Sequence, residues 1–150
     1  MCHRALQGVE AGYVKRRSRA LDSRPSRQHD ASTVARYEIF HNPRCGKSRQ
    51  TLARLTEAGV TPVVVEYLVA PPTRKRLQEI LKLLGFADPR QLMRTKEPIY
   101  GALGLARVTD PRLLLDAMVA NPILIERPIV IKDGTRAVLG RPPENVDALL

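Results

Sequence analysis

The sequence predicts an α/β domain with a small mixed sheet of four strands. Three observations support this prediction: a strand–helix–strand order that starts at residue 37, amphipathic helices in the middle of the chain, and a β-hairpin followed by a helix near its end. An apolar helix or sheet face must pack against another element, and this order of elements meets that need in a layered α/β fold.

The first 35 residues differ from the rest of the chain. They contain seven Lys or Arg and three Asp or Glu, without helical or strand periodicity. Their apolar surface is too small to offset the entropy lost on ordering them. We therefore expect a disordered basic extension at residues 1–35 and one folded domain at residues 36–150.

A strand–helix–strand unit is expected to open the folded domain. Polar and apolar side chains alternate at residues 37–40, good helix formers follow at residues 47–58, and Gly59 is suited to end that helix. A second strand is expected at residues 62–68. Its continuous run of valines predicts burial on both faces, and the order of elements predicts parallel pairing through a right-handed crossover.

Helices are expected in the middle of the domain. Thr73 is suited to cap a helix in which four apolar residues recur at helical spacing between residues 77 and 84, before Gly85 ends it. Asp-Pro pairs open a short helical turn at residue 88 and a helix at residues 112–120. Asn121-Pro122 closes this last helix.

The end of the chain predicts a hairpin and a helix. Strands are expected at residues 128–132 and 135–139, and the Asp133-Gly134 pair between them is typical of a type I′ turn. A final helix is expected from about Pro142 to Leu150. The complete order of elements is that of a thioredoxin-like α/β fold.

Cys45 is the candidate chemical centre, because it stands where the first helix begins. Unpaired backbone N–H groups and the helix dipole favour an anion there, and Arg44, Lys47 and Arg49 add positive charge. Such surroundings lower a cysteine pKa and produce a nucleophilic thiolate. The alternative is that Cys45 is a small buried apolar residue, as single cysteines often are.

Three familiar motifs around Cys45 each fail at one position. A redox C-x-x-C requires Cys at 48, where Ser48 stands, so an internal dithiol of this kind is excluded. A phosphatase-type C-x5-R loop requires Arg where Thr51 stands. A phosphate-binding P-loop requires Gly where His41 stands.

Composition narrows the classes of function. The formal net charge is +10, but aromatic residues make up only 4% and no helix gathers the charge into a stripe, so nucleic-acid binding is not favoured. Two cysteines favour a reducing compartment, and we expect a cytoplasmic protein without a membrane span. Residues 36–150 hold one His and one Cys, which supports no metal site.

Three ordered motifs resemble the glutaredoxin-coupled arsenate reductases. They are HNPRC at residues 41–45 with KSR at 47–49, NPILIERPIV at 121–130, and GRPPE at 140–144. The resemblance runs from about residue 37 to residue 150. The Lys47-Ser48 and Glu126-Arg127-Pro128 variants look more like the chromosomal branch of the family than its plasmid resistance branch.

The resemblance implies reduction of arsenate to arsenite by a cysteine thiolate, with glutathione as co-substrate, glutaredoxin as partner and no bound cofactor. It implies that Cys45 is the nucleophile, that His41 helps lower its pKa and that Ser48 is a polar neighbour of the sulfur. The oxyanion-binding residues would be Arg94, Arg127 and Arg141. It also implies a cis peptide bond at Arg127-Pro128.

Elementary chemistry agrees with an arginine clamp. Attack of a thiolate on an anion is opposed by charge repulsion unless fixed cations neutralise it, and guanidinium groups do so bidentately. Two alternatives stay open. One is a thioredoxin-fold regulator that binds RNA polymerase, and the other is a related glutathione-dependent oxidoreductase with another substrate.

Overall fold

The computed structural model describes residues 34–150, so the predicted extension at residues 1–35 falls almost wholly outside them and stays a prediction. Four strands and four α-helices form the domain. In chain order they are β1 (Tyr37–Phe40), α1 (Gly46–Glu57), β2 (Val63–Val65), α2 (Arg74–Leu84), α3 (Pro98–Ala102), α4 (Pro111–Ala120), β3 (Ile129–Lys132) and β4 (Arg136–Leu139). Short 3₁₀ helices are η1 (Pro89–Leu92), η2 (Leu105–Arg107), η3 (Pro122–Leu124) and η4 (Pro143–Leu149).

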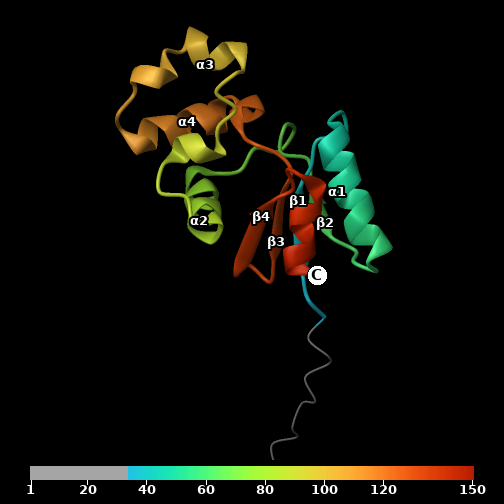
Figure 1. The fold of residues 1–150 in the computed structure, drawn as a ribbon. Coiled ribbons are helices and arrows are strands. Elements are labelled where there is room, and N and C mark those ends of the chain that lie inside the picture. Colours follow the sequence, from blue (N-terminus) through green and yellow to red (C-terminus); the bar gives the residue numbers. More distant parts are fainter. Residues whose placement is uncertain (1–33) are drawn as a thin grey trace, which may run out of the picture. The chain divides into compact units, whose positions relative to one another are not determined.

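The four strands form one mixed sheet in the order β2-β1-β3-β4. β1 pairs with β2 in parallel, whereas β3 pairs antiparallel with both β1 and β4. This arrangement confirms the predicted thioredoxin-like α/β fold with its mixed four-stranded sheet (Figure 1).

Helices cover both faces of the sheet, and each face has its own apolar core. α1 and η4 lie on one face, whereas α2 and α4 lie on the other (Figure 1). Side chains alternate between the two cores along β3, where Val130 faces α1 and Ile129 and Ile131 face α2. The smaller core contains Tyr37, Ile39, Leu55, Val130, Val146 and Leu149.

The prediction that β2 is buried on both faces is wrong. β2 is an edge strand with a neighbour on one side only, and Val63 and Val64 are 49% and 44% exposed. The strand is also shorter than expected, because the chain turns at Glu66, whose carbonyl accepts hydrogen bonds from the N–H groups of Val69 and Ala70. This early turn removes Tyr67 from the strand and directs the chain away from the sheet edge.

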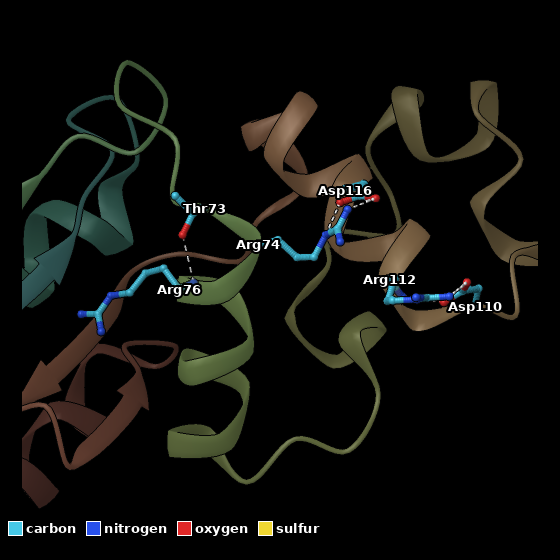
Figure 2. A network of polar contacts seen from close by, with 6 residues as sticks. All are labelled: Thr73, Arg74, Arg76, Asp110, Arg112 and Asp116. Atoms are coloured by element: carbon cyan, nitrogen blue, oxygen red, sulfur yellow. Dashed lines mark hydrogen bonds and ion pairs between the residues drawn. The ribbon is translucent and has the colours of Figure 1, made fainter.

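Local capping chemistry sets the helix ends as the sequence predicts. The Thr73 hydroxyl accepts the N–H of Arg76 at 3.1 Å (Figure 2). Gly85 ends α2 with a φ of 72°. Figure 2 also shows how α2 is tied to α4, since Arg74 donates to both carboxylate oxygens of Asp116 at 2.5 and 2.7 Å. Both side chains are exposed, so this ion pair contributes at most about 1 kcal/mol.

The C-terminal half of the domain differs from the prediction in some details and agrees with it in others. The final helix forms as the 3₁₀ helix η4, and α3 is an element that the sequence did not predict. Asp133 and Gly134 both have positive φ, at 53° and 66°, as a type I′ turn requires. β3 pairs with β4 at Lys132 and Arg136, however, so the hairpin loop contains three residues instead of two. The Arg127-Pro128 bond is cis as expected, and Arg141-Pro142 is cis as well.

Gly140, which follows β4, lies in close contact with α1 and with the segment before β3, and its substitution tests this packing. Its N–H donates to the Pro128 carbonyl at 2.9 Å, and a Cβ atom there would lie 2.6 Å from Oγ1 of Thr51 and 2.7 Å from Cγ of Pro128. Gly140→Ala is expected to lower the free energy of unfolding by about 1–3 kcal/mol, because the neighbours must shift to admit the methyl group. Urea unfolding followed by circular dichroism measures this change.

Gly101→Ala is the matched control for Gly140→Ala. Gly101 lies in α3, its φ is not in the left-handed region, and no atom lies within 4 Å of an added Cβ. Alanine favours a helix over glycine, so this variant should be as stable as the parent or slightly more stable. Equal unfolding midpoints for the two variants would contradict the close packing at Gly140.

Candidate functional site

One edge of the sheet gathers the candidate residues. Phe40, the last residue of β1, pairs with Val65 at the end of β2 and with Ile129 at the start of β3. The segments that follow β1 and β2 and the segment that precedes β3 therefore meet at this edge. The N–H of His41 donates to the Val65 carbonyl at 2.8 Å. This hydrogen bond holds the segment that follows β1 against the end of β2.

A tight turn between β1 and α1 positions Cys45. Its N–H donates to the Asn42 carbonyl at 3.0 Å, and its own carbonyl accepts from the N–H of Arg49 at 3.0 Å. The Asn42 side chain also accepts from the N–H of Arg44 at 2.9 Å. Cys45 thus occupies the N-cap position of α1 with an extended backbone and is 9% exposed.

Ser48 and His41 form a buried hydrogen-bond pair beneath this turn. The Ser48 hydroxyl oxygen accepts the N–H of Asn42 at 3.0 Å and lies 2.7 Å from Nδ1 of His41. One hydrogen lies between the Ser48 oxygen and Nδ1, and a neutral His41 can accept it or donate it according to its tautomer. Burial lowers the pKa of His41 and outweighs the raising effect of Glu66, while Arg49 lowers it further. A neutral His41 suits this contact, and it braces the turn that carries Cys45.

The surroundings of Cys45 favour its thiolate. Burial raises the pKa of the Cys45 thiol, but the N–H of Ser48, the charge of Arg127 and the N–H of Lys47 together outweigh burial. The pKa of Cys45 therefore lies below its ordinary value. These are the helix-start contacts that the sequence predicts, with Arg127 added by the fold.

Arg127 supplies a positive charge that lowers the pKa of Cys45. It precedes Pro128 and β3, and its Nε and Nη1 atoms are buried without a hydrogen-bond partner among residues 34–150. A buried guanidinium with free donors costs stability unless an acceptor occupies the space in front of it. The free donors of Arg127 therefore make it the candidate anion contact among the residues that act on Cys45.

Arg94 reaches the same region through a short antiparallel bridge. Its N–H donates to the Leu124 carbonyl at 2.7 Å, and the N–H of Glu126 donates to the Leu92 carbonyl at 2.8 Å. The Arg94 guanidinium pairs with Glu97, three residues later. Burial raises the pKa of Tyr67, and the positive charge of Arg94 acts against this effect.

Arg141 lies further out than the other two arginines. Its Nη1 atom is 3.4 Å from Oε2 of Glu126, and its side chain is 42% exposed. Arg94 and Arg141 line a pocket of about 200 Å³ together with both of these carboxylate partners, Glu97 and Glu126. In the structure, Arg127 therefore acts on Cys45, whereas Arg94 and Arg141 line a pocket together.

Sequence reasoning missed Tyr67 and the two glutamates that hold the arginines. The spacing of Arg94 and Glu97 was a usable signal, since residues three apart can pair when the chain turns. No sequence signal singled out Tyr67, because its place depends on the turn at the end of β2.

Two absences apply to the part of the chain that the structure describes. Within residues 34–150, no three His, Cys, Asp or Glu side chains lie together in a way that could hold a metal ion. In the same range, every helix is too short or too polar to cross a lipid bilayer.

Comparison with known proteins identifies the family of the chain. Residues 40–149 match the model of the ArsC family. The chain is 46% identical to an arsenate reductase of Neisseria meningitidis, over 75% of this chain and 97% of that protein. It is 51% identical to the uncharacterized protein YfgD of Escherichia coli, over 73% of this chain and 92% of that protein. The solved arsenate reductase of Vibrio cholerae superposes with a TM-score of 0.73 at 43% identity, covering 76% of this chain and 97% of that one.

The pH dependence of thiol alkylation tests the electrostatics of Cys45. In a Cys2→Ser background Cys45 is the sole cysteine, and iodoacetamide should react with a midpoint below the ordinary thiol pKa of about 8.5. Arg127→Gln removes a positive charge that favours the thiolate, so the midpoint should move to higher pH. Arg74→Gln, at the first residue of α2, is the control and should leave it in place, because Arg74 is exposed, pairs with Asp116 and is not among the groups that act on the pKa of Cys45. Overlapping profiles for the parent and Arg127→Gln would contradict the assigned cause.

Proposed function

The chain belongs to the ArsC family, and we propose that it reduces arsenate to arsenite with Cys45 as the nucleophile. The observation that carries this proposal is the pairing of a stabilised Cys45 thiolate with the buried free donors of Arg127. The arsenate reductases among its relatives match nearly their whole length, which supports the same reaction here.

Charge repulsion explains why the Cys45 thiolate needs the Arg127 guanidinium beside it. Arsenate at neutral pH is an anion, and a thiolate that approaches it is repelled. Buried fixed donors weaken this repulsion because they neutralise the developing charge without needing to reorganise. Arg127 can supply two donors from atoms that water does not reach. Arg94 adds positive charge from the adjacent bridge.

The proposed reaction requires two thiols. Cys45 attacks arsenic and a protonated oxygen leaves as water, which forms a sulfur–arsenic bond without a change in oxidation state. A second thiol then forms a disulfide with the first, and the electron pair of the sulfur–arsenic bond stays on arsenic as arsenite. Overall, arsenate and two thiols yield arsenite, one disulfide and water.

Glutathione is the proposed second thiol. Cys45 is the one cysteine within residues 34–150, so the described domain offers no internal partner. A hollow of about 360 Å³ beside the catalytic turn is lined by Arg44 and Glu66 together with the apolar Leu68 and Val69. These charges complement a small peptide thiol that carries carboxylates and an ammonium group. We propose that glutaredoxin then reduces the mixed disulfide, in the cytoplasm, where thiols are kept reduced.

Cysteine variants test the source of the electrons. Cys45→Ser should abolish arsenate reduction, whereas Cys2→Ser should retain it, because the external thiol completes the turnover. Coupled NADPH oxidation with glutathione, glutathione reductase and glutaredoxin measures the rate, and omission of either glutathione or glutaredoxin should stop it. If thioredoxin alone sustained turnover in the parent and failed with Cys2→Ser, Cys2 would be the resolving thiol and the glutathione route would be wrong.

Arginine variants test the anion clamp. Arg127→Ala should lower kcat/KM for arsenate by an amount that corresponds to about 2–4 kcal/mol of activation free energy, the scale for the loss of one preorganised donor. Arg127→Lys should restore part of this loss. Arg141→Ala should cost less, because its side chain is more exposed and faces Glu126. Arg74→Ala is the surface control. Equal kcat/KM values for the Arg127→Ala and Arg74→Ala variants would remove Arg127 from the clamp.

A further inference from the structure

Tyr67 is a buried polar side chain that the proposed reaction does not yet use. It follows β2, where the chain has turned at Glu66, and it is fully buried. Its ring belongs to the apolar core between the sheet and α2, together with Phe40, Leu77 and Ile129. Phe40 and Ile129 are paired residues of β1 and β3 at the same sheet edge that carries the catalytic turn. The ring is thus anchored directly behind the site.

The Tyr67 hydroxyl has no hydrogen-bond partner among residues 34–150. An unpaired buried hydroxyl costs free energy, and native proteins leave few of them. Nε and Nη1 of Arg127 are unpaired in the same way, and Arg127 and Cys45 both act on the pKa of Tyr67. Two kinds of buried donor without a partner therefore lie within electrostatic reach of Cys45.

The Tyr67 hydroxyl oxygen can accept from Arg127, but its own proton and the remaining N–H groups of Arg127 still need an acceptor. Burial raises the pKa of Tyr67 and outweighs the lowering effects of Arg127 and Arg94, so the group keeps its proton. A guanidinium has donors only. An anion with several acceptor oxygens can accept from both groups at once, and its negative charge also pairs with the guanidinium.

We propose that the Tyr67 hydroxyl donates a hydrogen bond to an oxygen of the tetrahedral oxyanion that Arg127 holds against Cys45. This inference rests on the proposed function and deepens it, because it adds a neutral, substrate-contacting donor to the cationic clamp. Tyr67 enters from the end of β2 and Arg127 from the start of β3, so the two donors reach the anion from different segments. Such a pair fixes the orientation of the anion as well as its charge.

Tyr67→Phe removes the hydroxyl and keeps the buried ring. The melting temperature should stay the same or rise, because an unpaired polar group leaves the core. In contrast, kcat/KM for arsenate should fall by about 10- to 100-fold, the range for one hydrogen bond to a charged group. In a Cys45→Ser background, which binds without turnover, the affinities for arsenate and inorganic phosphate measured by calorimetry should fall by a similar factor.

Tyr37→Phe is the matched control. Tyr37 is also buried, but its hydroxyl donates to the Leu149 carbonyl at 2.7 Å on the opposite face of the sheet. This variant should have a lower melting temperature and unchanged kcat/KM. The two variants should therefore show opposite patterns of stability and activity, which a purely structural role for Tyr67 would not produce.

The outcomes separate this inference from the proposed function. If the parent reduces arsenate and Tyr67→Phe retains both kcat/KM and anion affinity, the role of Tyr67 is overturned and the reaction stands. A Tyr67→Phe variant that loses melting temperature and activity together also overturns it. If the parent does not reduce arsenate but Tyr67→Phe weakens phosphate binding in the Cys45→Ser background, the Tyr67 contact stands and the proposed reaction fails.

Discussion

The position of β1 between β2 and β3 is the constraint on which the site depends. Phe40 pairs with Val65 in one direction and with Ile129 in the other, so the ends of two strands and the start of a third meet at one edge. α1 begins at that edge because a turn of only five residues separates it from β1.

The site combines groups that the fold alone would not favour. Burial opposes the Cys45 thiolate, and it opposes the free donors of Arg127 and the hydroxyl of Tyr67 as well. Each of these groups costs stability when the site is empty. An oxyanion would relieve the cost of the donors together, which explains how binding and positioning of the substrate can be linked. The neutral Ser48–His41 pair and the close contact at Gly140 hold the surrounding backbone in place.

Particular elements show where sequence reasoning succeeds. The N-terminal position of Cys45 on α1, the Thr73 cap and the Gly85 stop of α2, and the positive φ values at Asp133 and Gly134 were all predicted. β2 shows where it fails. Its run of valines predicted a strand buried on both faces. Burial depends on which strands become neighbours, however, and β2 lies at the edge of the sheet.

The sequence by itself determined the place of Cys45 at the start of α1 and the order of the elements, because helix starts, caps and turns depend on residues only a few positions apart. The three arginines were identified through ordered motifs, but their separate surroundings were decided by the tertiary structure. Glu97 and Glu126 hold Arg94 and Arg141, whereas Arg127 keeps free donors beside Cys45. Tyr67 joins this site only because β2 ends early and the chain turns. Contacts between segments tens of residues apart arise from packing of the whole domain, which local patterns do not encode.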